Sequence, residues 1–456
     1  MKELGNQFWQ LCTRPISKFL EEGVLGGLLL VFAAVCAIIW ANSPANHLYE
    51  SLLHQNVTFG IGPLAFEATF HHFVNDGLMA IFFFVVGLEI KRELLVGELS
   101  ETKKALLPAV AAVGGMVFPA LIYVLFNLQG DFISGWGVPM ATDIAFALGV
   151  MALLGNRVPL ALKVFLLALA IFDDMGAILV IAIFYGDQIN LYNLLIAGIL
   201  LAISILLNIK GVRKPLPYAL IGLFLWFALL NSGIHATIAG VLLALTIPAR
   251  SKMDNISFKK HTGELIRTFP EAPVQIMVTD ENQREFMKRI HCSVDDLDSP
   301  LQKLEDMLHG FSSFVILPIF ALANAGVHLS GEGGTLQVLH PVFLGIFAGL
   351  VLGKPLGIFI VVYLSSRIGL TKLPEQVEMK HILGIGCLAG IGFTMSIFVT
   401  NLAFADASVI NQAKIAILTA SIVSSILGIF LLRHFYKRQW EYLKKLEELG
   451  TKEGGA

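Results

Sequence analysis

The chain has 456 residues, of which 56 % are hydrophobic and 14 % are charged, and its mean hydropathy is +0.74. Soluble domains carry about 25 % charged residues, so this composition excludes an ordinary soluble protein and indicates an integral membrane protein with the lipid bilayer as its main partner. The net charge of −2 gives no reason to expect a nucleic-acid partner. The four cysteines match no zinc or redox spacing, and we expect no disulfide.

Residues 1–21 contain no long apolar run, so we expect no cleaved signal peptide. The aromatic and aliphatic side chains Phe8, Trp9, Leu11 and Phe19 are interspersed with polar ones. This pattern predicts a short amphipathic segment at the cytoplasmic surface of the membrane.

Twelve apolar runs follow, most of them long enough to cross a bilayer, which needs about 20 residues. The seventh and eighth runs are the shortest. The predicted spans are 22–41, 69–90, 105–126, 132–154, 159–185, 190–209, 215–230, 233–248, 307–327, 341–364, 381–404 and 409–432.

The basic residues support twelve spans. With the N-terminus in the cytoplasm, all of the 32 lysine and arginine residues except Lys354 and Lys414 fall in cytoplasmic segments or, as Lys163 does, at the cytoplasmic end of a span. Merging the seventh and eighth spans would place every later basic loop outside, against the positive-inside rule. We therefore predict an all-α polytopic protein with both termini in the cytoplasm. Its regions are the N-terminus 1–21, spans one to eight in 22–248, a loop 249–303, spans nine to twelve in 304–432, and a tail 433–456.

The first outside loop predicts a small β-hairpin over 56–67. Val57, Phe59 and Ile61 alternate with small or polar residues, and Gly62-Pro63 is a turn signal. An exposed strand edge can pair with its copy in a second chain, which would give a homodimer. A disordered loop is the alternative.

The cytoplasmic stretch 249–303 is polar and carries charges of both signs. It is long for a connection and shows no apolar core of its own. We interpret it as a flexible linker, with a regulatory flap as the alternative.

Helix-breaking residues cluster inside two spans. Gly135, Gly137 and Pro139 precede Asp143 in the fourth span, and four glycines between 384 and 392 interrupt the eleventh. Irregular backbone at membrane depth is tolerated where it lines a cavity or is buried in protein, and a matched pair of interrupted helices indicates a transporter. The two interrupted helices are offset by seven positions in the series, an odd number, so a repeat of helices 3–5 as helices 10–12 must be inverted.

Four charged residues fall near mid-membrane: Asp143, Asp173, Asp174 and Lys354. A charge at that depth costs roughly 2.5–3.5 kcal/mol on insertion scales, so adjacent acids indicate a site for a cation or a proton. Neighbouring helical residues point about 100° apart, so Asp173 and Asp174 face different directions. Carboxylate and hydroxyl oxygens, including that of Thr142, suit a hard cation.

Buried acids can hold either protons or a metal ion. Competition for one site with alternating exposure gives exchange, and two acids predict about two protons for each sodium. Asp143 and Lys354 are expected to offset the charged ends of the broken helices. Lys354 could instead pair with an acid when no ion is bound, or stabilise the fold alone.

At these residues the sequence resembles the NhaA family of bacterial sodium/proton antiporters. The resemblance rests on segments spread in order over most of the chain. They are ATDIAFA from Ala141, FDDMGA from Phe172, GKP from Gly353, GFTMS from Gly392, VGLEIKRE from Val86 and ILPIFALANAG from Ile316.

The resemblance implies twelve helices with crossing discontinuous helices 4 and 11, and alkaline-activated exchange of sodium or lithium for protons in the bacterial inner membrane, without a cofactor. It makes Asp173 and Asp174 the carriers, with Asp174 the expected obligatory proton carrier. It places Thr142 and Asp143 at the helix crossing, where Lys354 balances charge. It also implies that the outside hairpin mediates a dimer.

The resemblance further assigns the pH response to residues near the cytoplasmic mouth and to one histidine. The residues of 89–93 could equally form a juxtamembrane ion-pair cluster, and the histidine could be a hydrogen-bonded core residue. The positions are Glu89, Arg92, Glu93, Glu305, His309 and His235.

Three rival functions use similar features. An intramembrane aspartyl protease would need different residues around its acids than Thr142-Asp143 and Phe172-Asp173-Asp174. A cation channel would favour a ring of several subunits, and this site lies within one chain. A sodium-coupled symporter of an organic solute fits interrupted helices, but paired acids with a lysine fit proton exchange better. We therefore expect a secondary transporter and not an enzyme.

Overall fold

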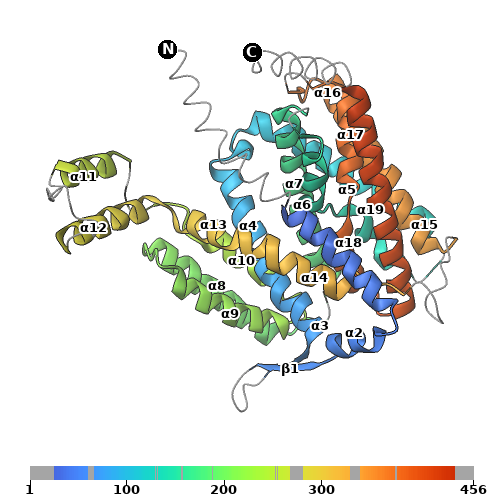
Figure 1. The fold of residues 1–456 in the computed structure, drawn as a ribbon, viewed down its shortest axis with the longest axis horizontal. Coiled ribbons are helices and arrows are strands. Elements are labelled where there is room, and N and C mark those ends of the chain that lie inside the picture. Colours follow the sequence, from blue (N-terminus) through green and yellow to red (C-terminus); the bar gives the residue numbers. More distant parts are fainter. Residues whose placement is uncertain are drawn as a thin grey trace, which may run out of the picture. The chain divides into compact units, whose positions relative to one another are not determined.

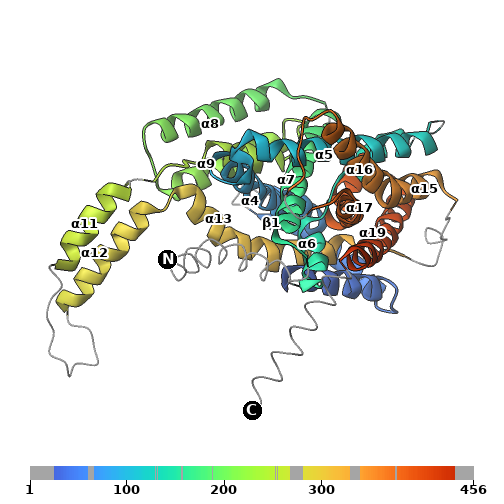
Figure 2. The same ribbon diagram turned by 90° about the horizontal axis from the view of Figure 1, so that it is seen from above.

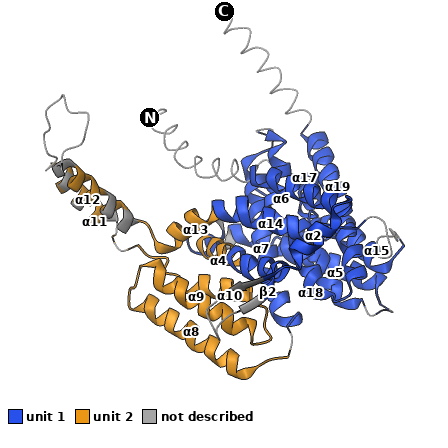
Figure 3. Ribbon diagram, turned by 60° about the horizontal axis from the view of Figure 1, so that its bottom comes forward, with its two compact units in different colours: residues 1–82, 93–187, 310–456 blue, residues 83–92, 188–309 orange. Residues whose placement is uncertain are grey.

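The computed structural model describes residues 25–59, 66–128, 130, 132–155, 158–186, 188–251, 253, 255–267, 281–328, 339–374 and 377–436. The described chain is mostly helical and forms two compact units (Figure 3), each of which we describe by itself. The predicted segment 1–21 and nearly all of the tail 433–456 lie outside the described residues.

Unit 1 comprises residues 1–82, 93–187 and 310–456. Its membrane core is built from long apolar helices and interrupted helices (Figure 1). The elements are the helix Leu25–Ala41, α2 (Asn46–Leu53), β1 (Asn56–Phe59), β2 (Phe66–Thr69), α3 (Phe70–His72), η2 (Phe73–Leu78), the ends of α4 (Met79–Leu95), η3 (Glu98–Ser100), α5 (Thr102–Phe126), η4 (Ile133–Met140), α6 (Ile144–Ala152), α7 (Leu160–Phe184), η6 (Ser312–Ile316), α14 (Leu317–Asn324), α15 (Pro341–Ala348), η7 (Gly349–Gly353), α16 (Lys354–Arg367), α17 (Met379–Ala389), α18 (Phe393–Ala403) and α19 (Ala407–Phe435).

Unit 2 comprises residues 83–92 of α4 and residues 188–309. In it α8 and α9 run side by side (Figure 2), and α10 packs against both. The elements are α8 (Leu191–Ile209), α9 (Pro215–Leu230), α10 (Ile238–Thr246), α11 (Asn255–Arg267), α12 (Glu281–Leu297) and the greater part of α13 (Pro300–Phe311).

Eight described helices are long and apolar enough to cross a membrane, or up to ten if each of two bent pairs is one span. The bent pairs are Leu25–Ala41 with Asn46–Leu53, and Met379–Ala389 with Phe393–Ala403. At the seventh and eighth predicted spans the structure has α9 with 16 residues and α10 with nine. Both helices are too short to be among these eight to ten candidate spans.

The eighth predicted span begins later than expected. Gly233 has a φ of +84°, a left-handed conformation that favours glycine, and Ser232 Oγ accepts a hydrogen bond from Ile234 N at 3.2 Å. Because of this turn, α10 begins only at Ile238. His235 therefore lies in a turn, and its predicted place inside a helix was wrong.

Helices occupy much of the described part of the stretch 249–303, which we interpreted from the sequence as a flexible linker. It contains α11 and α12, which lie side by side in Figures 1 and 2. On α12, Phe286 and Ser293 are buried although most of their neighbours are exposed. These two residues are seven positions apart and so lie on one face of α12, and the many charged residues between them hide this face in the sequence.

In the first outside loop, β1 and β2 pair antiparallel, with Asn56 opposite Thr69 and Phe59 opposite Phe66. The connecting residues 60–65 lie outside the described residues. The second strand leads directly into α3, since Thr69 Oγ1 accepts a hydrogen bond from His72 N at the start of that helix.

The backbones of helices α5 and α16 approach each other closely at two glycines. A Cβ atom on Gly357 would collide with the carbonyl oxygen of Gly114, and one on Gly114 would collide with that of Gly357. Small residues allow such close packing between membrane helices. This contact fixes α16, and with it Lys354 at its first position, against α5.

Candidate functional site

The carboxylate of Asp173 lies at the centre of a buried polar cluster in unit 1. Its three side chains, Asp173, Thr142 and Lys354, are fully buried. Thr142 Oγ1 lies 2.7 Å from Asp173 Oδ2 and 2.9 Å from the carbonyl oxygen of Ala389, and can donate its single proton to either. The cluster therefore joins α7 to the breaks in both interrupted helices.

Lys354 neutralises this carboxylate directly. Its Nζ lies 3.0 Å from Asp173 Oδ2 and also donates a hydrogen bond to the carbonyl oxygen of Met140. Met140 is the last residue of η4, where unpaired carbonyl groups make the helix end negative. The π-helical η7 ends at Gly353, and such irregular turns are frequent at functional sites.

Asp174 is also buried, with 1 % exposure. It is close enough to Lys354 to attract its ammonium group electrostatically. The two acids have different surroundings, as helical geometry requires. The other oxygen of Asp173, Oδ1, has no hydrogen-bond partner among the described residues, and it faces Gly115 of α5, whose added Cβ would lie 3.7 Å away.

Asp143 binds the N-termini of two helices at once. Its Oδ1 accepts a hydrogen bond from Phe146 N at 2.9 Å and so caps α6. Its Oδ2 accepts from Thr394 N at 3.1 Å and from Thr394 Oγ1 at 2.5 Å, at the start of α18. Since helix N-termini are positive, one carboxylate offsets both.

The two interrupted helices also meet through their backbones. Asp143 N donates to the carbonyl oxygen of Ile391 at 2.7 Å, and Ser396 Oγ donates to that of Val138 at 2.8 Å. These contacts satisfy backbone groups that the breaks leave free. The crossing thus combines a cation at the carboxyl end of η4 with an anion at the amino ends of α6 and α18.

Four of the six residues expected to respond to pH form two ion pairs within unit 2. Arg92 Nη1 lies 2.5 Å from Glu305 Oε1, and His309 Nδ1 lies 3.1 Å from Glu89 Oε1. The Glu305 side chain is only 5 % exposed. Glu93 follows Arg92 on α4 and is half-buried; it belongs to neither pair.

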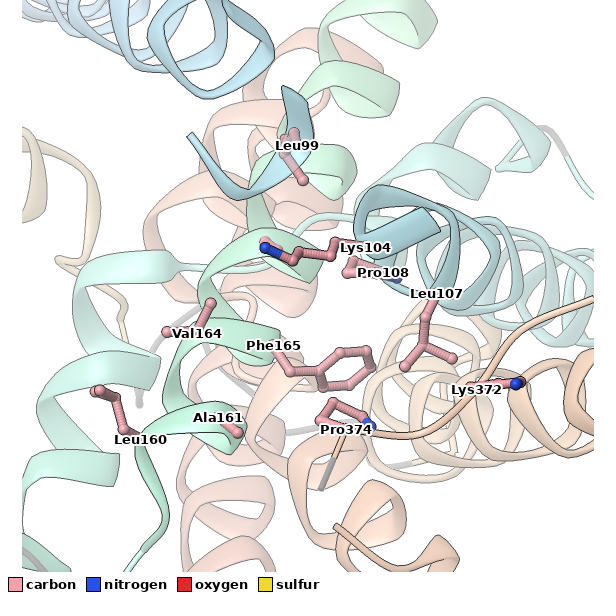
Figure 4. A pocket seen from close by; sticks show the side chains of 11 residues that line it. Leu99, Lys104, Leu107, Pro108, Leu160, Ala161, Val164, Phe165, Lys372 and Pro374 are labelled. Atoms are coloured by element: carbon pink, nitrogen blue, oxygen red, sulfur yellow. The ribbon is translucent and has the colours of Figure 1, made fainter. Parts of the chain in front are cut away.

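A separate cavity of about 530 Å³ opens in unit 1 near the first turns of α5 and α7 (Figure 4). Phe165 points into it, and Lys104 and Lys372 lie at its sides with their amino groups directed apart. Asp173 and Lys354 are not among its lining residues. These are Leu99, Lys104, Leu107, Pro108, Leu160, Ala161, Val164, Phe165, Ala168, Lys372 and Pro374.

Comparison with known proteins identifies the family. The sequence model of the Na+/H+ antiporter 1 family matches residues 17–432. The chain belongs to the Na+/H+ antiporter 1 family. The resemblance seen in the sequence is therefore confirmed.

Among curated members of the Na+/H+ antiporter 1 family, the chain is 47 % identical to Na(+)/H(+) antiporter NhaA 1 of Saccharophagus degradans, over 91 % of this chain and 90 % of that protein. It is 44 % identical to Na(+)/H(+) antiporter NhaA of Sulfurimonas denitrificans, over 93 % and 96 %. It is 47 % identical to that of Oleidesulfovibrio alaskensis, over 92 % and 93 %.

Sequence reasoning missed the part played by Thr394 in this Na+/H+ antiporter 1 family member. The signal was present, because Thr394 follows a glycine-rich break and stands in the first turn of a helix, where side chains and N–H groups bind anions. The sequence did not reveal that the anion would come from Asp143, 251 positions away.

Proposed function

We propose that this protein is a Na+/H+ antiporter that exports sodium, or lithium, in exchange for about two protons by alternating access. It is a secondary transporter of the bacterial inner membrane and not an enzyme. The observation that carries the proposal is the buried Asp173 carboxylate, held by Thr142 and Lys354 where two interrupted helices cross. The family membership and its curated Na+/H+ antiporters support it.

The chemistry proposed follows from the cluster. A sodium ion bound by Asp173 would compete with the Lys354 ammonium for the same carboxylate, and the Thr142 hydroxyl supplies a further neutral oxygen ligand. Asp174, buried beside them, takes and releases the obligatory proton. Since two protons would exchange for one sodium, net charge moves and the membrane potential drives the cycle.

The proposed architecture has twelve spans, an inverted repeat of helices 3–5 and 10–12, and both termini in the cytoplasm. The proposed pH response lies in the pairs Glu89–His309 and Arg92–Glu305, with Glu93 and His235, and activates exchange at alkaline pH. The two pairs support this, because each places a titratable side chain against a partner near the same end of unit 2.

A sodium-driven exchange of protons is the test of the transport proposal. The full chain is reconstituted into sealed vesicles with an imposed pH difference, and sodium is added at about pH 6.5 to 8.5, from the ordinary pKa of histidine upwards. We expect sodium to dissipate the pH difference, with a faster rate at alkaline pH. Asp174→Asn should abolish the response, whereas Asp298→Asn, at an exposed acid, should retain it.

The same vesicles discriminate the rival functions. Sodium uptake that requires an organic solute would support the symporter, and cleavage of an added peptide would support the protease. A rate that does not respond to an imposed membrane potential would exclude electrogenic exchange. A rate that is flat with pH would exclude alkaline activation.

We also propose a homodimer through residues 56–67. The antiparallel pair β1–β2 supports it, because a two-stranded ribbon has two edges that can pair with another copy. Chemical crosslinking in membranes should give a dimer for the full chain and a monomer after replacement of the strand-forming residues by a glycine-serine segment. A crosslinked dimer of the altered chain would contradict this interface.

A further inference from the structure

A tyrosine at the end of α7 binds the backbone of η4. Tyr185 Oη donates a hydrogen bond to the carbonyl oxygen of Ser134 at 2.6 Å and accepts one from Gly137 N at 3.2 Å. These are the two backbone groups that an i→i+3 bond joins in a 3-10 helix. Gly137 allows the contact, because a Cβ atom at that position would lie 2.7 Å from Tyr185 Oη. The hydroxyl therefore bridges one turn of η4.

Tyr185 is itself fixed to α7, the helix that carries Asp173. Its backbone N–H donates to the carbonyl oxygen of Ile181 at 3.2 Å, so it continues the last turn of that helix. The preceding residue, Phe184, makes a second contact, since its ring meets that of Trp136 edge to face with centroids 5.1 Å apart. The end of α7 is thus tied to the middle of η4.

The bridged turn leads directly to a partner of Lys354. Residues three apart are eclipsed in a 3-10 helix, so Ser134, Gly137 and Met140 form one row of η4. Met140 lies about 6 Å beyond Gly137 along the axis, because the rise is ~2 Å per residue. Its carbonyl oxygen accepts a hydrogen bond from Lys354 Nζ. The turn held by Tyr185 therefore sets the position of this carbonyl group.

Lys354 joins the same two elements that Tyr185 holds together. Its ammonium group lies 3.0 Å from Asp173 Oδ2 of α7 and donates to the carbonyl oxygen of Met140 in η4. A shift of η4 along α7 would move one acceptor away from the other, and hydrogen bonds weaken steeply when their geometry is lost. The fully buried lysine can meet both acceptors only while the two elements keep their register.

We propose that Tyr185 is a positioning residue for ion exchange, whose hydroxyl keeps η4 in register with α7. A sodium ion that binds Asp173 displaces the Lys354 ammonium, and the Met140 carbonyl oxygen is then the acceptor left among the described hydrogen-bond partners of that lysine. A buried charge without a partner is costly, so a well-placed carbonyl group favours the sodium-bound state. This inference rests on the exchange function proposed above.

Tyr185→Phe removes the bridging hydroxyl and keeps the ring. In vesicles containing the full chain, the apparent affinity for sodium should fall about fivefold, the net effect of one hydrogen bond. The maximal rate at saturating sodium should change less than about twofold, because the loss lies in ion binding. Tyr123→Phe is the matched control: Tyr123 ties the start of the same segment to α5, through the carbonyl oxygen of Phe132 at 2.7 Å. It should lower the unfolding temperature and leave the sodium affinity unchanged.

Gly137→Ala tests the same contact from the other partner. Its methyl group would displace the Tyr185 hydroxyl, so the sodium affinity should again fall about fivefold, the net effect of one hydrogen bond. In the Tyr185→Phe protein the hydroxyl is absent, so adding Gly137→Ala should lower the affinity by less than about twofold more, as expected for residues in contact. Two losses that multiply in the double variant would overturn the proposed bridge.

Hydrogen–deuterium exchange in the same vesicles measures the tie to η4 without any need for transport. Amide protection of 133–140 should fall about fivefold in Tyr185→Phe, as expected for easier local opening. Unchanged protection would show that the hydroxyl does not hold η4, and lower protection with unchanged sodium affinity would show a contact that does not position the site; either result refutes the proposal. If the unaltered chain shows no sodium-dependent dissipation of a pH difference, the antiporter proposal fails, while the protection of 133–140 still decides whether Tyr185 holds η4.

Discussion

Replacing Asp143 by asparagine tests the double capping of α6 and α18. The amide oxygen of the variant can still accept from Phe146 N, so the cap of α6 survives. Its amino group then takes the place of Oδ2 and faces two donors of Thr394. The threonine hydroxyl can turn to accept, but the buried Thr394 N–H loses its acceptor.

The expected loss of stability can be worked from these contacts. A buried N–H without an acceptor costs about 1–3 kcal/mol. Removing the negative charge from two helix N-termini costs a further ~0.3–1 kcal/mol each. The free energy of unfolding should therefore fall by about 3 kcal/mol, using the middle of these ranges.

Thermal unfolding of the purified protein measures the loss. Asp406→Asn is the matched control, because Asp406 caps only α19 and asparagine caps a helix as well as aspartate does. A double-mutant cycle with Thr394→Val should show coupling of about 0.5–3 kcal/mol. If Asp143→Asn and Asp406→Asn lower the unfolding temperature equally, the reasoning about a shared cap is wrong.

Three further substitutions probe other contacts. Thr142→Val removes a hydroxyl 2.7 Å from Asp173, and the apparent affinity for sodium in the vesicle assay should fall about tenfold, equal to ~1.4 kcal/mol. Thr142→Ser keeps the hydroxyl and should keep the affinity of the unaltered protein. Equal affinities for the two variants and the unaltered protein would contradict a role for the hydroxyl. Gly357→Ala places a methyl group against the Gly114 carbonyl and should lower the free energy of unfolding by about 1–3 kcal/mol. Gly198→Ala is the control, because a methyl group there would meet no atom within 4 Å, and it should not destabilise the protein. A Gly357→Ala protein of unchanged stability would disprove the close backbone contact. Arg92→Gln leaves the buried Glu305 carboxylate without its ion pair and should lower the free energy of unfolding by about 3 kcal/mol. Arg289→Gln breaks the exposed pair with Glu285 and should lower it by under ~1 kcal/mol. Equal unfolding temperatures for the two variants would show that burial does not strengthen the Arg92–Glu305 pair.

The breaks in two membrane helices were predictable because their cause is local. Glycine and proline interrupt a helix wherever they occur in number, so Gly135–Pro139 and Gly390–Gly392 mark irregular backbone without tertiary information. The cost of burying Asp173 is also local, and it marked this residue as a candidate site before any contact was known.

The partners of those residues were not predictable, because they depend on distant segments. Nothing near Asp143 in the chain indicates Thr394, and His71 pairs with Asn324 across 253 positions. Element boundaries were missed for a different reason. The short α10 begins after a single left-handed glycine, and α12 depends on a few buried side chains such as Phe286. Such features change the hydropathy of a segment too little to be seen in the sequence.

The mutual contact of Gly114 and Gly357 makes α5 and α16 a rigidly packed helix pair. No side chain separates the two backbones, so sliding one helix past the other would force carbonyl groups into direct collision. We therefore expect Lys354, at the first position of α16, to move together with α5 if the helices around it rearrange. A covalent link between these two helices should consequently leave exchange intact, which makes this pair a fixed reference against which the movement of every other helix can be measured.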